Sequence, residues 1–207
     1  MQISESYDSA AQAYAEHLAG ELVHKPLDRH LLSRFAEEMR GRGLVADLGC
    51  GPGHISRYLH EQGGTTIGID LSPGMVEVAA GLNPGLDFRV DDMTRLSFAD
   101  ASLAGVLSFY SIVHFILAEL EGVFREMRRV LMSGGLALVA FHIGEQVVHL
   151  DDLYGAPVSL DFRFHVPGRV AEALQAAGLP VVEHTEREPY EGVEYPSRRC
   201  YLLARAV

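Results

Sequence analysis

The segment "VADLGCGPGHIS", residues 45–56, joins an apolar run to three glycines at alternate positions and then to a helix-like stretch. Glycine adopts positive φ values without steric cost, and its missing side chain lets a ligand approach the backbone. The pattern therefore predicts a strand, a tight turn and a helix, with a nucleotide-like ligand at the carboxyl end of the strand. The three glycines are Gly49, Gly51 and Gly53.

The glycine spacing separates this turn from the dinucleotide fingerprint. That fingerprint is G-x-G-x-x-G, and its third glycine lets the helix pack closely on the sheet. Here the spacing is G-x-G-x-G, and His54 stands where the third glycine would be. The spacing argues against a nicotinamide or flavin cofactor, so a nicotinamide-dependent oxidoreductase is the less favoured alternative.

Strand-like and helix-like segments alternate along the chain. Apolar runs bounded by glycine or charged residues predict strands at 44–49, 65–70, 86–91, 103–109, 135–142, 180–188 and 198–206. Apolar residues at helical spacing predict helices at 6–20, 26–40, 54–62, 72–82, 117–131 and 167–178, the first of them capped by Ser4 or Ser6. This alternation predicts an α/β fold, with a mostly parallel sheet covered on both faces and a hairpin at its edge.

The overall composition bears on the partners of the protein. A chain of 207 residues with 48% hydrophobic residues suits one domain with a real core. Its formal charge of −11 repels phosphate backbones, so we expect no nucleic-acid partner. The densest basic run, residues 125–129, falls at a predicted helix end, where cations complement the helix dipole.

Other sequence features bear on location and metals. The N-terminus lacks the pattern of a signal peptide, and no apolar run is long enough to span a membrane. Two cysteines, Cys50 and Cys200, fit reduced thiols in a cytoplasmic protein. The histidines lack the spacing of a metal-ligand set, so we expect no metal site.

Acidic residues follow the second and third predicted strands. Asp70 lies 19 residues past Gly51, and a carboxylate at this place can accept hydrogen bonds from a ribose diol. Its alternative role is to end the strand or cap the next helix. Asp91 and Asp92 end the third strand, followed by Met93. Such a carboxylate can accept from an adenine amine while the methionine packs on the ring, although a solvated turn is the simpler interpretation.

Four segments in chain order resemble motifs of the class I S-adenosylmethionine-dependent methyltransferases, in the small-molecule branch with a generic methyltransferase domain. "VADLGCGPG" resembles the first motif and "IGIDLSPGM" the acidic second motif. "DDMTRLSF" resembles the family's "GDAxxLPF" segment, and "RRVLMSGGLALVAFH" resembles "RVLKPGGxLLI". The chain departs from the pattern at Ala104, where the family often has Asp, and at Met132 and Ser133, in place of Lys and Pro.

The resemblance implies a Rossmann-like fold in a single domain over residues 1–207. It implies a seven-stranded, mostly parallel sheet of order 3-2-1-4-5-7-6, with the last strand antiparallel and helices on both faces. Residues 1–42 would form a helical lid, and the connection 143–168 would shape the substrate pocket.

The resemblance also implies S-adenosylmethionine as cofactor and S-adenosylhomocysteine as product. Asp47 would organise the glycine turn, Asp70 would accept from the ribose, and Asp92 would accept from the adenine amine, with Asp91 as its competitor. The expected cofactor contacts are Asp47, Gly49, Gly51, Gly53, Asp70, Leu71, Met75, Asp92, Met93 and Phe109.

Candidates for catalysis follow the fourth and fifth strands. His114 is the first choice for a general base or orienting group, since its ordinary pKa of about 6.5 lies near neutrality; a packed, hydrogen-bonded histidine is the equal alternative. His142 comes second, at the end of the fifth strand, with His165 behind it. Tyr7 and Tyr14 share one face of the first helix, and Tyr14 would close the site against water.

These residues together indicate a methyltransferase acting on O, N or C of a small, apolar or aromatic molecule by in-line displacement. A cofactor-binding protein without transferase activity is the alternative from another class. The expected partner is a small-molecule acceptor, without nucleic acid or membrane, and the protein would be a monomer or homodimer.

Overall fold

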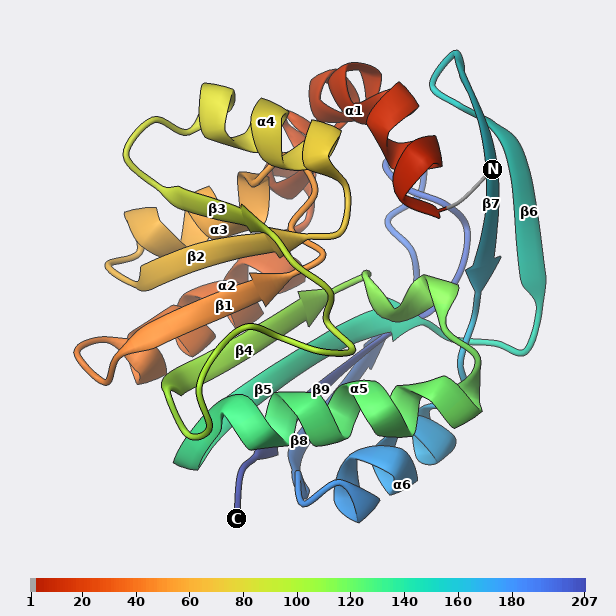
Figure 1. Cartoon of the computed structure of the whole chain (residues 1–207). Coiled ribbons are helices and arrows are strands. Elements are labelled where there is room, and N and C mark those ends of the chain that lie inside the picture. Colours follow the sequence, from red (N-terminus) through yellow and green to blue (C-terminus); the bar gives the residue numbers. More distant parts are fainter. Residues whose placement is uncertain (1–2) are drawn as a thin grey trace.

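A seven-stranded sheet forms the centre of the computed structural model, which describes residues 3–207 (Figure 1). Its strand order is β3-β2-β1-β4-β5-β9-β8. All neighbours pair in parallel except β9, which runs antiparallel to both β5 and β8. The strands are β1 (Leu44–Leu48), β2 (Thr65–Asp70), β3 (Asp87–Val90), β4 (Leu103–Phe109), β5 (Leu131–His142), β8 (Val181–Arg187) and β9 (Arg199–Arg205).

Helices cover both faces of this sheet. Helices α5 and α6 lie on the face nearer the viewer in Figure 1, and α2 and α3 lie behind it. The helices are α1 (Ile3–Leu18), α2 (Pro26–Met39), α3 (His54–Glu61), α4 (Pro73–Leu82), α5 (Leu117–Val130) and α6 (Pro167–Ala176), with short 3-10 turns η1 (Glu21–His24) and η2 (Ile112–His114). None of the helices within residues 3–207 combines the length and apolar character that crossing a bilayer requires.

The architecture confirms the predicted fold, but two strands outside the sheet shift the labels of its last two strands. The order of strands within the sheet corresponds to the expected 3-2-1-4-5-7-6, but the last two strands are β8 and β9. An extra hairpin, β6 (Val147–Leu153) and β7 (Ala156–Arg163), separates from the sheet and accounts for the shift in labels. No strand is predicted for this segment from the sequence, because its burial depends on contacts with the distant helix α1.

The starts of α1 and β5 differ by more than two residues from those predicted. Helix α1 begins at Ile3, so Ser4 and Ser6 lie within the helix and neither caps it. Strand β5 begins at Leu131, directly after α5, whereas the prediction started it at residue 135. Leu131 pairs with Leu103 of β4, and the register of the two strands shifts between this pair and the next. This pairing extends β5 on the N-terminal side of its apolar run.

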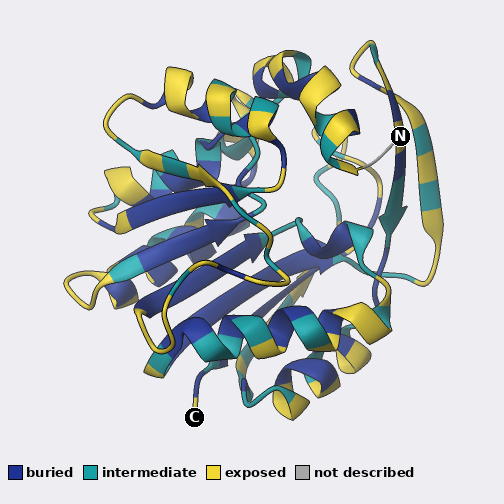
Figure 2. Ribbon diagram, in the orientation of Figure 1, coloured by how far each residue is buried: buried dark blue, intermediate teal, exposed yellow. Residues whose placement is uncertain are grey.

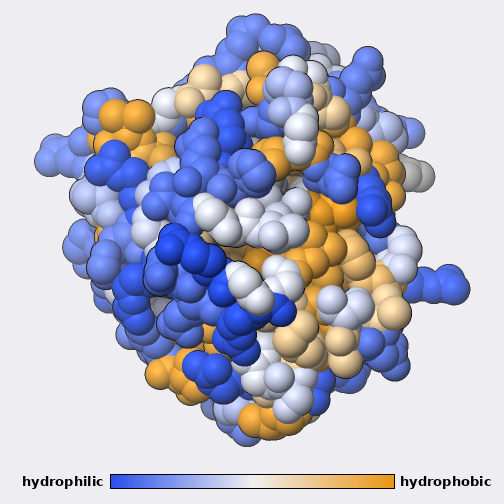
Figure 3. Space-filling model, turned by 90° about the vertical axis from the view of Figure 1, so that its left-hand side faces the viewer, coloured by the Kyte–Doolittle hydropathy of each residue, from blue (hydrophilic) through white to orange (hydrophobic). Residues whose placement is uncertain are grey.

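The strands at the centre of the sheet are buried on both faces, as their apolar composition predicts. Every residue of β4 from Leu103 to Ser108 is buried. One core cluster packs β1, β4 and β5 against α5 and α6, and a second packs them against α2 and α3. Figure 2 shows buried residues along these strands, and Figure 3 shows a face at the amino ends of the strands where hydrophilic residues are numerous. The sheet is therefore a rigid support for groups at its carboxyl edge.

Helix α1 lies between α4 and the β6–β7 hairpin (Figure 1). Its Asp8 carboxylate accepts hydrogen bonds from Ser72 Oγ at 2.6 Å and from the Gly74 amide at 2.7 Å, at the first turn of α4. A Cβ on Gly74 would lie 3.0 Å from the Asp8 backbone, so glycine permits this close approach. On the other side, Ser6 Oγ accepts from the Ser159 amide of β7. Helix α1 is thereby bonded to both neighbours.

A cluster of buried charges joins α2 to the C-terminal strands. Arg187 donates to the fully buried carboxylate of Asp28 at 2.8 Å and also pairs with Glu194. The hydroxyl of Tyr201 donates to Asp28 at 3.0 Å. Burial raises the pKa of Asp28, although the Arg187 guanidinium opposes this. The remaining basic members of the cluster are Lys25 and Arg199, which both face Glu194.

We predict that Asp28→Ala lowers the free energy of unfolding by about 3 kcal/mol, because removing one member of a buried ion pair leaves the other charge desolvated. Urea denaturation of both proteins measures this loss. Asp100→Ala is the control, since its ion pair with Arg129 is exposed and such pairs contribute at most about 1 kcal/mol. Equal losses in the two variants would contradict the importance assigned to the buried cluster.

Candidate functional site

A cleft opens at the carboxyl edge of the sheet, beneath α1. It encloses about 1090 Å³, counted out to its solvent opening, which suits a ligand the size of a nucleoside derivative. Its walls come from the ends of β1, β2, β3 and β4 and from α1, η1 and η2. This is where open parallel sheets bind ligands, and it is the place at which the sequence predicts a ligand.

The glycine turn forms the floor of the cleft. Gly49 has a φ of 70°, and a Cβ there would lie 2.4 Å from the Ser111 side chain, so no other residue fits without displacement. Gly51 faces α1, with Tyr14 Cε1 3.6 Å from where its Cβ would be. Gly53 points elsewhere: its Cβ would meet the Phe88 ring at 2.6 Å. Gly49 and Gly51 line the cleft, whereas Gly53 lets α3 pack against β3.

Asp70 connects the glycine turn to the start of α4. Its carboxylate accepts hydrogen bonds from the Gly51 amide at 2.8 Å and from the Ser72 amide at 2.9 Å. Burial raises the pKa of Asp70, and the backbone donors partly offset this. A carboxylate has about four acceptor positions, so two remain for a ligand in the cleft. The two interpretations of Asp70, turn anchor and ribose ligand, are therefore compatible.

Asp47 supports the turn from below. It is 1% exposed and accepts a hydrogen bond from Ser56 Oγ at 2.7 Å. Burial raises the pKa of Asp47 to about 6, against the opposing effect of the Ser56 hydrogen bond. Asp47 also lines the cleft, so it can serve both the turn and a ligand.

The side chains expected around an adenine lie together at one end. Leu71, Met75, Asp92 and Met93 all line the cleft there. Asp91 lines it as well, but its carboxylate accepts from Ser97 at two atoms, 2.6 and 2.8 Å away. Asp92 accepts from Thr94 through Oδ1 alone. Both candidates line the cleft. Among residues 3–207, both carboxylate oxygens of Asp91 accept hydrogen bonds, whereas only Oδ1 of Asp92 does.

Tyr7 and His114 form a hydrogen-bonded pair on the opposite side. The Tyr7 hydroxyl lies 2.7 Å from His114 Nε2, and His114 Nδ1 lies 3.0 Å from the Asp161 carbonyl. A carbonyl only accepts, so Nδ1 carries the proton and Nε2 of a neutral imidazole accepts from Tyr7. Burial lowers the pKa of His114, which favours this neutral form.

Aromatic side chains surround this pair. The Tyr14 ring packs edge-on against Tyr7 at 6.0 Å between centroids, and Phe109 and Tyr110 continue the wall after β4. Tyr110 has a φ of 60°, and its hydroxyl is held by Tyr201 at 2.7 Å. This end of the cleft is therefore an aromatic chamber with one basic imidazole.

His142 does not reach the cleft. Its Nδ1 lies 2.7 Å from Ser197 Oγ, and its ring stacks on Phe164 at 4.9 Å. Burial, with the nearby Arg199, lowers the pKa of His142 to about 3. His165 is also outside the cleft, beside the Ile112 carbonyl at 3.4 Å. Of the predicted site residues, His142, His165 and Gly53 do not line the cleft.

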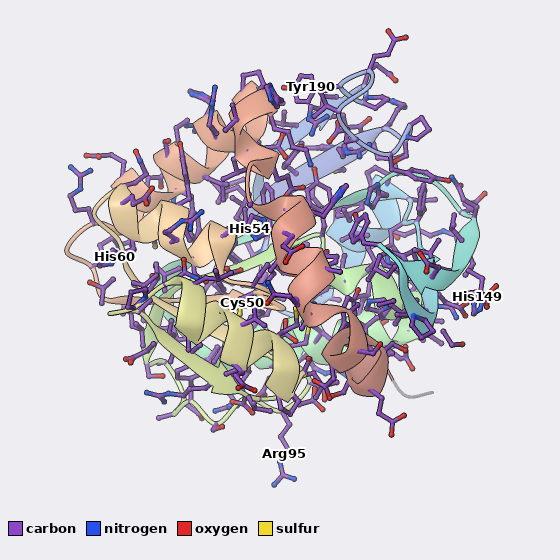
Figure 4. The ribbon with its side chains drawn as sticks, turned by 90° about the horizontal axis from the view of Figure 1, so that it is seen from above. Cys50, His54, His60, Arg95, His149 and Tyr190 are labelled. Carbon is purple, nitrogen blue, oxygen red and sulfur yellow. The ribbon has the colours of Figure 1, made fainter. Side chains whose placement is uncertain are left out.

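Glu21 and His54 also line the cleft, although neither is predicted as a site residue from the sequence. Glu21 Oε2 lies 2.8 Å from His54 Nε2, across the mouth of the glycine turn. His54 was noted only as a departure from the dinucleotide fingerprint. In Figure 4, Cys50 and His54 lie near the centre of the molecule, whereas His60, Arg95 and His149 lie toward the outside. Glu21 is 33 residues from its partner, so no local spacing indicates the pair.

The charge of the cleft is distinctive. Five carboxylates line it, and within residues 3–207 no lysine or arginine does. The five are Glu21, Asp47, Asp70, Asp91 and Asp92. Such a lining suits a ligand with cationic groups and disfavours one that carries a pyrophosphate.

Comparison with known proteins agrees with the fold and the motifs. Residues 45–135 match the model of a methyltransferase domain. Malonyl-[acyl-carrier protein] O-methyltransferase of Pseudescherichia vulneris is 28% identical over 175 residues, which cover 84% of this chain and 65% of that protein. Probable tRNA methyltransferase 9B of Homo sapiens is 32% identical over 117 residues, covering 55% of this chain and 24% of that protein. The chain thus spans less than two thirds of the length of these relatives.

A solved structure shares the fold over nearly the whole chain. It is the 1,6-didemethyltoxoflavin-N1-methyltransferase of Burkholderia thailandensis, crystallised with its substrate and S-adenosylhomocysteine. The TM-score is 0.74 at 18% identity, covering 99% of this chain and 87% of that one. The motifs, the strand order and these relatives support a class I S-adenosylmethionine-dependent methyltransferase, and residues 45–135 match the methyltransferase-domain model.

Proposed function

We propose that this protein transfers the methyl group of S-adenosylmethionine to O, N or C of a small, apolar or aromatic molecule. The observation that carries the proposal is the acidic, glycine-floored cleft without a lysine or arginine among its described lining residues. S-adenosylmethionine has a sulfonium and an ammonium group, so this lining suits it. The pyrophosphate of a nicotinamide or flavin dinucleotide would meet five carboxylates instead.

The residues present fit the parts of this cofactor. At Gly51 the nearest atom to a Cβ would be Tyr14 Cε1 at 3.6 Å, which allows close approach to the backbone, whereas the missing Cβ of Gly49 makes room for Ser111. Asp70 would accept from the ribose hydroxyls, and Asp92 from the adenine amine beside Met75 and Met93. Phe109 and Tyr14 would then flank the sulfonium end. When bound, the cofactor supplies an activated methyl group, so the protein has chiefly to orient the acceptor in line with it.

The aromatic chamber supports an apolar or aromatic acceptor. Tyr7, Tyr14, Phe109, Tyr110 and Phe115 line it. Arg163, a basic side chain of β7 that could bind an acidic acceptor group, pairs with Asp161 at 3.2 Å and does not line the cleft. An uncharged acceptor therefore fits better than a carboxylate.

The surface favours a small molecule over RNA, although one relative is named as a tRNA methyltransferase. The basic run at the end of α5 is engaged within the protein. Arg129 pairs with Glu126 and Asp100, both at 2.6 Å, and Arg125 faces Glu121 at 3.6 Å. Arg128 donates to the Leu131 carbonyl at 3.4 Å. These partners reduce the positive charge that would attract a phosphate backbone.

Where the acceptor carries a proton, His114 is the group placed to take it. Its Nε2 is the basic nitrogen of the neutral ring, since Nδ1 donates to Asp161. Tyr7 donates to that nitrogen in this structure, so an acceptor hydroxyl or amine would replace Tyr7 or approach through it. Tyr14, which packs against Tyr7, would close the cleft against water.

Calorimetric titration tests the cofactor assignment. We expect S-adenosylhomocysteine to bind with micromolar affinity and NADH not to bind. Asp70→Ala should weaken the binding of S-adenosylhomocysteine by about 1.5–3 kcal/mol, the range for a hydrogen bond to a charged group. Asp151→Ala, on the exposed hairpin, is the control and should bind normally. Unchanged affinity in a folded Asp70→Ala protein would defeat the ribose assignment, and binding of NADH would favour an oxidoreductase.

The role of His114 predicts a pH dependence. With any acceptor that the enzyme methylates at O or N, His114→Ala should lower the rate about 100-fold or more, at unchanged affinity for S-adenosylhomocysteine. Burial lowers the pKa of His114 below its ordinary value of about 6.5, and only the neutral form accepts a proton. The wild-type rate should therefore be constant above pH 6.5 and fall in more acidic buffer.

Single-turnover rates between pH 5 and 9 check this dependence, with His60→Ala on the outside of α3 as the control. Binding of the acceptor without any methyl transfer would favour a non-catalytic protein. A normal rate in His114→Ala would make the imidazole a packing group, held by Tyr7 and Asp161.

A further inference from the structure

Glu21 occupies the end of the cleft opposite the predicted adenine site. It begins the short turn η1, which follows α1 and passes beside the glycine turn. Its carboxylate meets His54, which directly follows the glycine turn, and its charge helps to raise the pKa of Tyr14. The glycine turn follows β1, Asp70 ends β2, and Asp92 and Met93 follow β3, so the strand order β3-β2-β1 puts Asp70 between Asp92 and the Glu21 end. A ligand whose adenosine lies on Asp70 and Asp92 therefore extends its remaining part toward Glu21.

The Glu21 carboxylate is ionised in this environment. Burial raises its pKa, but the hydrogen bond from His54 and the charge of Lys25 overcome this and lower the pKa to about 2. Its side chain is 20% exposed, so the carboxylate is neither free in solvent nor sealed in the core. A fixed negative charge thus stands at the open end of the glycine turn.

The carboxylate has acceptor capacity left. Oε2 faces His54 Nε2 at 2.8 Å and Oε1 pairs with Lys25, which uses two of about four acceptor positions. Lys25 has a second carboxylate partner, Glu194, at 3.3 Å. If a cationic group of a ligand displaced Lys25 from Glu21, Lys25 would still have Glu194 as its anionic partner.

We propose that Glu21 binds the α-ammonium group of the cofactor's amino-acid tail and so selects for a ligand that carries that tail. The proposal rests on the function proposed above and assigns one of its contacts to a residue outside the four sequence motifs. It also gives η1 a role, since this turn brings a carboxylate from the N-terminal segment against the glycine turn. His54 orients that carboxylate through its hydrogen bond.

A comparison of three ligands tests the contact. S-adenosylhomocysteine carries the complete tail, its desamino analogue lacks only the ammonium group, and 5′-methylthioadenosine lacks the whole amino acid. Calorimetry measures each with wild type, Glu21→Gln and the control Glu16→Gln. Glu16 lies on α1, exposed, with Gln12 as its partner, so it carries the same charge away from the cleft.

We expect Glu21→Gln to weaken S-adenosylhomocysteine binding about tenfold, because the amide no longer offers a charge to the ammonium group. The desamino analogue and 5′-methylthioadenosine should bind wild type and Glu21→Gln within twofold of each other. Glu16→Gln should bind all three ligands as wild type does. Thermal unfolding checks that the variants are folded. If Glu21→Gln is unfolded, Glu21→Asp replaces it. This variant retains the charge and should weaken the binding of S-adenosylhomocysteine by less than tenfold.

Two results would overturn the proposal while leaving the cofactor assignment intact. One is normal binding of S-adenosylhomocysteine by Glu21→Gln. The other is an equal loss for all three ligands, which would show that Glu21 only shapes the glycine turn. Failure of wild type to bind S-adenosylhomocysteine at all would instead refute the proposed function, and the assignment of Glu21 with it.

Discussion

The cleft depends on the hydrogen bonds that the Asp70 carboxylate accepts from two turns. The Gly51 amide brings the glycine turn to the end of β2, and the Ser72 amide brings the start of α4 to the same point. Ser72 then caps α4 through the Met75 amide and donates to Asp8 of α1. One half-buried carboxylate thereby aligns the floor, one wall and the covering helix. Each of these donors is a backbone amide or a short side chain, so the relative positions of the glycine turn, α4 and α1 can vary little.

The covering helix completes a site that the sheet alone leaves open. Helix α1 brings Tyr7 and Tyr14 over the cleft and is bonded to α4 on one side and to β7 on the other. Tyr7 then meets His114, whose other nitrogen is fixed by the Asp161 carbonyl of β7. The contacts of α1 and β7 with His114 therefore fix the tautomer of this histidine, while α1 covers the cleft. Among residues 3–207, His54 is the other histidine that lines the cleft. The cover over the cleft and the hydrogen bonds of His114 thus depend on the same contacts.

Buried charges link the two ends of the site behind its walls. Glu21 pairs with Lys25, Lys25 with Glu194, and Glu194 with Arg187, which reaches Asp28. Tyr201 connects Asp28 to Tyr110 on the cleft wall. Each charge has an opposite neighbour, which offsets the cost of its burial. This cluster fixes η1 and the chamber wall relative to each other, so both ends of the cleft have a common support.

The sequence by itself determined the strand–turn–helix unit, the alternation of elements and the place of the cleft. Each of these follows from local rules: hydrophobic periodicity, glycine at a tight turn, and acidic residues at strand ends. Asp70 and Met93, which these rules associate with strand ends, line the cleft, as do Leu71 and Met75, which the family resemblance implies. The rules succeed because a residue's position relative to its own strand end is fixed by a few neighbouring residues.

Only the tertiary structure decided which side chains meet. His114 and His142 both follow strand ends, yet one enters the cleft and the other stacks on Phe164. Glu21 reaches His54 across 33 residues, and Gly53 turns toward Phe88 instead of the cleft. The hairpin β6–β7 is buried by α1, from the other end of the chain. Such contacts depend on how distant elements pack, and no local periodicity carries that information.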